Sequence, residues 1–593
     1  MVEQELLKEA ESNWIELGSI YKKKGRLLHT LGRLGEAIAA YETSIHWKQH
    51  IGENSHGLAA TYSSLGDVQM ETTQPTEAKQ HYEDALNVLK ALDCDPKHVN
   101  FTLTSGKLRF LMGDFLTSLA FLARARQSIS VSPLLVMDQS AYDLRCMARI
   151  YKARGDVETA VEILKESLLL TSHRTGSLER ALSMMHLGRC SSDIAKHDEA
   201  IKWLKQSLDI QTSLVSESMV VVETTTKLGK AYFLSQDFDK ALQNYSSAKS
   251  IILRVAPKDA EGLAEILYCK GEVYEAKNDW EDASKHYNEC VSVMQRARLR
   301  DHLGIAKAMH AIGRLKLIRE FSTEAIPYLE EAIRIRRMNF DEIALSQTLQ
   351  DLGILATRIG DYKMAEENLN EALSIRKRQK KLKPWIAETM LALGDNYMAQ
   401  GVRDSASKLY QESMGILDDT DPLRSAVYFA MGKLKVKTGK YDEAVVFLRK
   451  LFDIRETTFG RSNTLFGRAS LFLGVVHFLA NHDDIAGDML SDFVHTCVDV
   501  DKQKTRMTDQ KWMTIHLTLS HILLGDILYR MKKDGSIAMW KLALKLCDGG
   551  DKIDKDLAEM VSRRKLSASL GSEITLEARD RESIYECLFT SVE

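Results

Sequence analysis

Basic side chains recur at a nearly constant interval in the N-terminal half of the sequence. Lys107, Arg149, Arg189 and Lys230 are separated by 42, 40 and 41 residues, and each directly follows a small residue. An arginine can bind a carboxylate through two parallel hydrogen bonds, whereas a lysine acts as a point charge. These residue types at a fixed interval therefore predict a binding surface for acidic groups.

Two further basic residues flank Arg149. Arg145 and Lys152 lie four residues before it and three residues after it, spacings that place all three on one face of a helix. We define the basic stripe as Lys107, Arg145, Arg149, Lys152, Arg189 and Lys230. The other interpretation is a solvated charged face that neighbouring residues balance, and both interpretations are open at this stage.

The sequence carries no signature of an enzyme. It lacks a glycine-rich phosphate loop, a nucleophile elbow, an HExxH motif and the protein-kinase motifs. Carboxylates are abundant, but they fall on predicted helices that imply no pocket of fixed geometry. We therefore expect a non-catalytic protein that uses no cofactor.

Metal binding is not expected either. His46 and His50 lie four residues apart with Glu42 one turn earlier, a spacing that can hold zinc, but no fourth ligand is near in the sequence. The eight cysteines are scattered without a CxxC pair, and we expect reduced thiols.

One candidate modification site lies near the C-terminal end. Arg564 precedes Ser567 by three residues in RRKLSAS, a pattern that basophilic kinases phosphorylate. A phosphate at Ser567 would add negative charge to this segment.

The elements that position the basic stripe are predicted from an internal repeat. A small residue of one predicted helix returns with an interior period close to forty-one residues. The thirteen markers are Gly18, Gly66, Gly106, Ala148, Gly188, Gly229, Gly271, Gly313, Gly353, Gly394, Gly432, Gly474 and Gly525. In a typical unit an alanine follows twelve residues later and a second small residue seven after that, as in Gly353, Ala365 and Ala372. This spacing predicts that each unit is a helical hairpin.

Glycine has two predicted roles within a unit. Inside a helix, Gly353 costs about 1 kcal/mol relative to alanine, so its recurrence predicts a close approach by another backbone. In the turn, Gly360 can end the first helix and Asp361 can cap the second. The first unit contains an insertion at residues 27–33, which we expect to form an extended turn.

The whole frame resembles the tetratricopeptide repeat from Trp14 to Leu546. The long period and the segment IGENSHGLAATYSSLGDV, residues 51–68, look like the kinesin light chain and nephrocystin-type subclass. The resemblance implies an all-α, right-handed superhelical solenoid. We expect about thirteen units over residues 1–547, and an irregular linker with a C-terminal docking helix or tail over residues 548–593.

The resemblance also implies where the charges point. In this family the residue after the first-helix small residue faces the inner groove, so the basic stripe would line that groove around units three to six. The seventh unit reverses the sign with Glu265, Glu272 and Glu275. Chaperone-binding members carry asparagine at this position and no unit here does, so we expect no binding of chaperone C-terminal tails.

The leading interpretation is a non-catalytic scaffold or adaptor that binds other proteins through acidic extended peptides, as a kinesin light chain-like cargo adaptor would. One alternative is a structural subunit of a cytoskeletal or ciliary assembly, binding through its convex face. Another is an autoinhibited regulator whose tail after Asp548 occupies the groove until Ser567 is phosphorylated.

Composition excludes several partners. The net charge of −3 argues against nucleic acid, and the longest apolar run, LFLGVVHFLA, is too short for a membrane span. The first residues lack a signal peptide's apolar core, so we expect a cytoplasmic protein.

Overall fold

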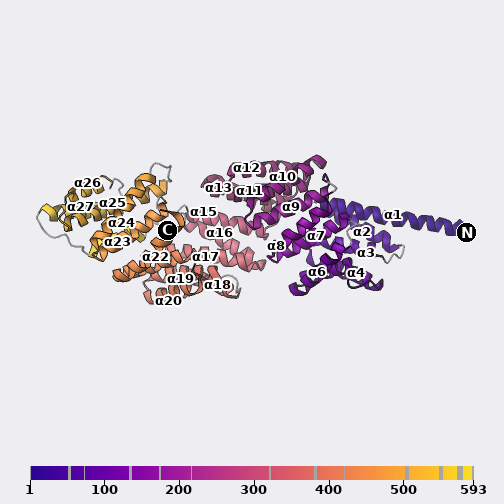
Figure 1. Cartoon of the computed structure of the whole chain (residues 1–593), viewed down its shortest axis with the longest axis horizontal. Coiled ribbons are helices and arrows are strands. Elements are labelled where there is room, and N and C mark those ends of the chain that lie inside the picture. The colour runs from indigo at the N-terminus through magenta and orange to yellow at the C-terminus, as the bar shows by residue number, and fades with distance from the viewer. Residues whose placement is uncertain are drawn as a thin grey trace. The chain divides into compact units, whose positions relative to one another are not determined.

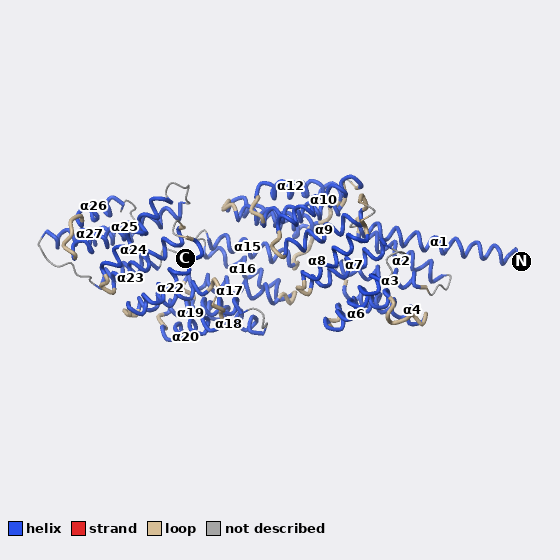
Figure 2. The backbone as a smooth tube through the Cα atoms, in the orientation of Figure 1, coloured by secondary structure: helices blue, strands red, loops and turns tan. Residues whose placement is uncertain are grey.

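In the part of the chain that the structure describes, helices joined by turns and loops make up the fold (Figure 1, Figure 2). The computed structural model describes residues 2–31, 33–50, 55–71, 74–131, 137–172, 175–215, 217–318, 322–378, 383–419, 421–460, 463–500, 507–546, 552–569 and 578–589. Over these ranges no strand occurs, which confirms the all-α prediction. Among the same helices, none is both long enough and apolar enough to cross a membrane.

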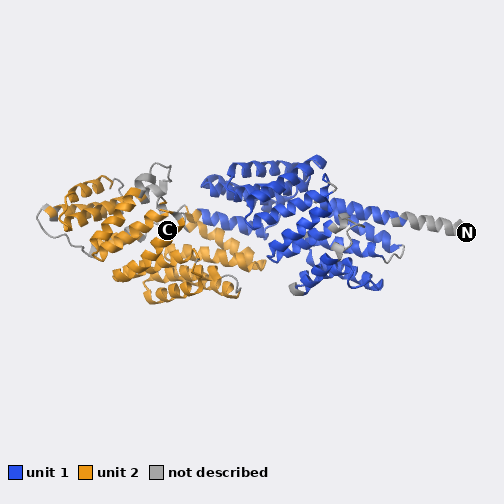
Figure 3. Cartoon of the chain, in the orientation of Figure 1, with its two compact units in different colours: residues 1–315 blue, residues 316–593 orange. Residues whose placement is uncertain are grey.

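The chain divides into two compact units, Met1–Leu315 and Lys316–Glu593 (Figure 3). The helices up to the division are α1 (Val2–Thr30), α2 (Leu34–His50), α3 (His56–Glu71), α4 (Pro75–Ala91), α5 (Val99–Leu111), α6 (Phe115–Val131), α7 (Met137–Ala153), α8 (Val157–Leu170), α9 (Leu178–Asp193), α10 (His197–Leu214), α11 (Met219–Leu234), α12 (Phe238–Val255), α13 (Ala260–Ala276), α14 (Trp280–Arg296) and α15 (Leu303–Ile318). The division falls inside α15.

The second unit continues with α16 (Ser322–Met338), α17 (Glu342–Ile359), α18 (Tyr362–Arg378), α19 (Lys383–Gln400), α20 (Arg403–Ile416), α21 (Arg424–Lys437), α22 (Tyr441–Phe459), α23 (Thr464–Leu479), α24 (Asp483–Val500), α25 (Met507–Arg530), α26 (Ser536–Leu546), α27 (Lys552–Ser569) and α28 (Ala578–Phe589). The last two helices lie in the segment for which we expected a linker with a docking helix or tail. Both contact α25, and α28 also contacts α21.

Consecutive helices pack as hairpins within each unit. The pairs run from α1 and α2 to α13 and α14 in the first unit, and from α17 and α18 to α25 and α26 in the second. Each of the thirteen marker residues lies in a different odd-numbered helix, from Gly18 in α1 to Gly525 in α25. The period read from the sequence is therefore confirmed. We call the odd-numbered helix of a hairpin its first helix and the even-numbered one its second helix.

The two kinds of helix form separate layers. In the first unit, each first helix also contacts the next first helix, from α1 and α3 to α11 and α13. Second helices do not pack closely on one another in the described part of this unit. Stacking of this kind buries a continuous core and crowds the first helices together, so the groove side of the first unit is the side that they line.

The marker glycines make room for large side chains of the second helix. A Cβ atom added to Gly271 would lie 2.4 Å from Cε1 of Tyr287, and one added to Gly353 would lie 2.5 Å from Cγ of Leu369. At Gly353 the backbone oxygen of Ala365 is also near, at 3.3 Å. The nearest neighbour is thus a side chain, where we had expected a backbone.

Gly271→Ala should lower the free energy of unfolding by about 1–3 kcal/mol, because the added methyl group overpacks the joint against Tyr287. Gly487→Ala in α24 is the matched control, since the nearest atom to its added Cβ is Ile527 Cγ2 at 3.9 Å. Alanine favours helix there, so this variant should match or slightly exceed the wild-type stability. Thermal unfolding followed by circular dichroism measures both, and equal melting of the two variants would contradict the packing.

The turn prediction is confirmed at the Gly-Asp pair. Gly360 ends α17 with a φ of +83°, a left-handed conformation that glycine adopts without steric cost. The carboxylate of Asp361 accepts a hydrogen bond from the Met364 backbone N–H at 3.0 Å, which caps the start of α18.

The expected extended turn at residues 27–33 is wrong for residues 27–30, which are helical, whereas Leu31 and Arg33 do lie in the turn before α2. Helix α1 continues to Thr30, and Leu28 is buried. The apolar residues of the insertion repeat at helical spacing, so burial favours a longer helix over a turn.

Candidate functional site

The first-helix side of the first unit contains a cavity of about 450 Å³. Its lining includes Arg145 and Arg149 from α7, and His186 and Arg189 from α9. Apolar side chains supply much of the remaining wall; they include Leu182, Met185, Val222 and Ile266. The cavity therefore joins guanidinium groups to an apolar surface.

A second cavity, of about 280 Å³, shares two of these arginines. Arg149 and Arg189 line it together with Lys107, Asp67 and Tyr82. We call the two cavities together the inner groove. Four of the six residues of the basic stripe line this groove, and Lys152 and Lys230 are not in the lining of either cavity.

Lys107 lines the groove but already has an internal partner. Its side chain is 5% exposed, and Nζ lies 2.7 Å from Oδ2 of Asp67, the residue at the same position in the preceding hairpin. Burial alone would lower the pKa of Lys107, but the Asp67 carboxylate raises it above its usual value. The ammonium group therefore stays charged and is neutralised inside the protein.

Arg145 is held by a carboxylate as well. It forms an ion pair with Glu179 at the start of α9, and the other oxygen of Glu179 lies 3.0 Å from Nη2 of Arg26 in α1. Burial would raise the pKa of Glu179, but Arg145 and Arg26 together hold it below its usual value. This shared carboxylate fastens the end of α1 to α9.

The last turns of α1 consequently form part of the groove. His29 and Thr30 line the larger cavity, together with Leu34 of α2. The sequence reasoning missed this wall, because it took the insertion for a turn and gave Arg26 no partner. The helical spacing of the apolar residues in the insertion was the signal that could have predicted this longer helix.

The remaining stripe residues differ in their surroundings. Nζ of Lys152 lies 2.5 Å from Oδ2 of Asp193, and burial together with the nearby Arg189 lowers its pKa. Lys230 is exposed on α11. Two of the three acidic residues of the seventh hairpin have partners: Glu265 pairs with Lys227 at 3.1 Å, and Glu275 pairs with Arg314 at 3.1 Å.

Arg149 and Arg189 are the stripe residues that both cavities share. Nε of Arg189 is buried without a hydrogen-bond partner. Burial, with Arg189 and Arg149 close by, holds the pKa of His186 well below its usual value. His186 is therefore neutral at pH 7, and the positive charge of this part of the groove resides on guanidinium groups. An acidic group of a ligand would offset that charge.

The candidate phosphorylation site lies in α27, in the second unit. Ser567 is within the helix, and Arg564 is 3% exposed and bonded to Asp526 and Asp580. The arginine that would identify the site to a kinase is therefore engaged in the folded tail. Phosphorylation of Ser567 stays a prediction.

Comparisons with known proteins agree with the repeat. The sequence matches the tetratricopeptide repeat over residues 16–91, 140–213, 262–338, 319–378 and 425–458, which together span half of the chain. No curated protein matches the sequence.

Similar solved structures include three helical proteins. BtubC from P. vanneervenii is 18% identical with a TM-score of 0.35, and the match covers 37% of this chain and 90% of that one. The TPR-like repeats of a kinesin light chain-like protein from Podosopora anserina are 19% identical with a TM-score of 0.32, and cover 35% and 99%. The apo form of RapI is 15% identical with a TM-score of 0.47, and covers 62% and 99%.

Proposed function

The chain belongs to the tetratricopeptide repeat family, and on that basis we propose that it is a protein–protein interaction scaffold whose inner groove binds an acidic, extended segment of a partner protein. The repeat generally acts as a non-catalytic scaffold, because stacked hairpins create extended concave surfaces. Acidic specificity is the part of the proposal that goes beyond the family.

The observation that carries this proposal is the pair Arg149 and Arg189. Both line both cavities, and the buried Nε of Arg189 has no hydrogen-bond partner. Lys107 and Arg145 support the groove through Asp67 and Glu179, so we assign them a positioning role. We propose Arg149 and Arg189 as the ligand-contacting residues of the basic stripe, because each of them lines both cavities.

The apolar residues that line the larger cavity restrict the class of peptide that we expect to bind. Leu182, Met185 and Ile266 line the same cavity as the arginines. A peptide that places an apolar or aromatic side chain beside a carboxylate would bury area on this wall while its charge meets Arg189. This chemistry agrees with the cargo-adaptor role that the resemblance to kinesin light chains implies, and we include that role in the proposal.

Binding of a fluorescent, glutamate-rich peptide of about ten residues with one tryptophan tests the proposal on the purified full chain. The Arg149→Glu/Arg189→Glu variant should bind this peptide at least about tenfold more weakly and with less dependence on salt, because two charge-assisted contacts become repulsive.

Arg334→Glu/Arg337→Glu is the matched control. It changes the net charge equally, but both arginines are about half-exposed on α16 and pair with Glu331 and Glu371. This control should bind the peptide as the wild type does. Equal weakening in the two variants would show non-specific attraction and refute the groove assignment.

A further inference from the structure

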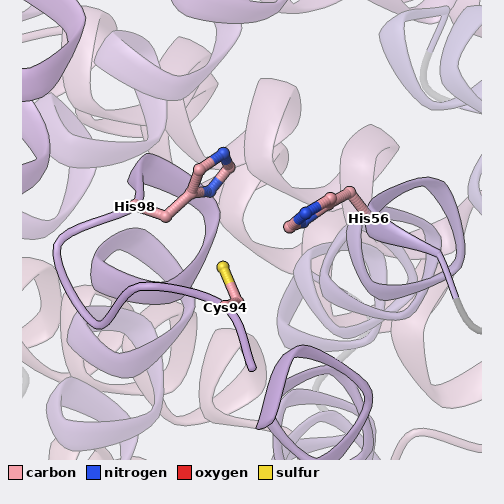
Figure 4. Close-up of side chains that lie close together, drawn as sticks. All are labelled: His56, Cys94 and His98. Atoms are coloured by element: carbon pink, nitrogen blue, oxygen red, sulfur yellow. The ribbon is translucent and has the colours of Figure 1, made fainter. Parts of the chain in front are cut away.

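Three side chains that can ligate metal ions converge near the turn between α4 and α5 (Figure 4). His56 begins α3, whereas Cys94 and His98 belong to the turn. One ligand atom from each residue lies within 4.8 Å of the other two. Both histidines are exposed and Cys94 is partly buried, so an ion in solution can reach all three.

The turn is built so that Cys94 and His98 face the same space. Asp93 adopts a φ of +48°, which reverses the chain after α4. The carbonyl oxygen of Asp95 then accepts the His98 N–H at 2.8 Å, and the Asp95 carboxylate accepts the Lys97 N–H at 2.8 Å. These bonds fix the backbone between the two candidate ligands.

The two imidazole rings are stacked across this space. The ring centroids of His56 and His98 lie 4.9 Å apart with an interplanar angle of 24°.

We propose that His56, Cys94 and His98 form a binding site for a zinc-type divalent ion. One thiolate and two imidazoles suit zinc, which binds sulfur at about 2.3 Å and nitrogen at about 2.0–2.1 Å in tetrahedral geometry. These bond lengths place the ligand atoms of any two of the three residues about 3.5 Å apart around the ion. Side-chain rotations of the exposed histidines would bring the ligand atoms to this separation. The fourth position is left to water or to another group.

Coordination has two identifiable local costs. The Cys94 thiol loses the hydrogen bond that it donates to the Asp95 carbonyl oxygen at 3.8 Å. Nδ1 of His98 accepts a hydrogen bond from the Asn100 N–H at 3.2 Å and so caps α5. Ligation through Nδ1 gives up this bond. In return, the ion ties the start of α3 to the turn that precedes α5, and so links two successive first helices.

Titration of the metal-free full chain with Co²⁺ and Zn²⁺ tests the site. We expect one equivalent of Co²⁺ to produce a thiolate-to-metal charge-transfer absorption, which Zn²⁺ then displaces. Cys94→Ser should abolish this absorption. Both Cys94→Ser and His56→Ala should weaken Zn²⁺ binding at least about tenfold. Added Zn²⁺ should also raise the melting temperature of the wild type and leave that of Cys94→Ser unchanged.

The His46→Ala/His50→Ala variant is the matched control. It removes an exposed histidine pair at i,i+4 spacing in α2, whose rings lie 6.2 Å apart, and it keeps the proposed site intact. This control should bind one equivalent of Zn²⁺ with unchanged affinity. Loss of binding in the control, or full binding by Cys94→Ser, would overturn the proposal.

Discussion

Asp67→Ala should lower the free energy of unfolding by about 3–5 kcal/mol, because it leaves the Lys107 ammonium buried without a counter-ion. The Asp67 carboxylate accepts hydrogen bonds from the hydroxyl groups of Tyr82 at 2.8 Å and Tyr142 at 3.0 Å, in addition to the Lys107 contact at 2.7 Å. Helices α3, α4, α5 and α7 each contribute one of these four side chains. One substitution therefore weakens three successive hairpins.

Chemical denaturation followed by circular dichroism measures this loss of stability. Two further variants test whether the loss comes from the buried ion pair. Asp67→Ala/Lys107→Met removes both charges and should be more stable than Asp67→Ala, because no ion is left uncompensated. Asp239→Ala removes an exposed partner of Lys277 and should cost less than about 1 kcal/mol. Stability of Asp67→Ala within error of Asp239→Ala would contradict the buried ion pair.

Arg564→Ala should release the C-terminal helices, again at a cost of about 3–5 kcal/mol. Nε of Arg564 lies 2.8 Å from Oδ2 of Asp526 in α25, and Nη1 lies 3.3 Å from Oδ2 of Asp580 in α28. Trp540 of α26 donates to the other oxygen of Asp526 at 3.1 Å. Both carboxylates are buried. Asp580 keeps its ion pair with Arg563 at 2.7 Å, so removal of the Arg564 guanidinium leaves the Asp526 carboxylate without its ion-pair partner.

This defect should depend on pH. Burial raises the pKa of Asp526 even with Arg564 beside it, and loss of the cation should raise it further. A carboxyl group whose folded-state pKa exceeds its unfolded value binds more protons when folded. Stability therefore increases as the pH falls from above the folded-state pKa to below the unfolded-state pKa. The stability difference between Arg564→Ala and the wild type should therefore be larger at pH 7 than at pH 5.

Limited proteolysis gives the direct readout, since undocked α27 and α28 become accessible to protease. Arg337→Ala is the control, because that arginine is 53% exposed and pairs with Glu371 on the surface. It should keep the wild-type cleavage pattern. A protected tail in Arg564→Ala would mean that apolar packing alone holds these helices.

The fold was predictable because the repeat pattern depends on residues that are close to one another in the sequence. The marker spacing and the Gly360-Asp361 turn depend on helix geometry within some forty residues, and each marker does lie in its own first helix. The partner of the marker was misjudged, since sequence spacing does not reveal that Tyr287 lies directly over Gly271.

The candidate site was predictable only in part, because the charged residues of each hairpin were considered separately and not compared with those of the next hairpin. Asp67 and Lys107 occupy equivalent positions in successive hairpins, carry opposite signs and pair in the structure. Arg149 and Arg189 occupy the next two positions and carry the same sign, so they do not neutralise each other. The opposite signs at these two equivalent positions were the available signal for the internal pair of Asp67 and Lys107.

Other features depend on tertiary contacts that have no sequence signature. Arg26 and Glu179 are separated by seven helices, and only the fold brings α1 to α9. His56 is far in sequence from Cys94 and His98, and the turn geometry at Asp93 decides that the three side chains meet.

Photo-crosslinking of the full chain with a benzophenone-labelled acidic peptide, mapped by mass spectrometry, locates the bound peptide directly. Occupation of the inner groove predicts crosslinks to the first helices α7 and α9, and their loss in Arg149→Glu/Arg189→Glu. Crosslinks confined to the second helices α8 and α10, unchanged in that variant, would contradict binding in the groove.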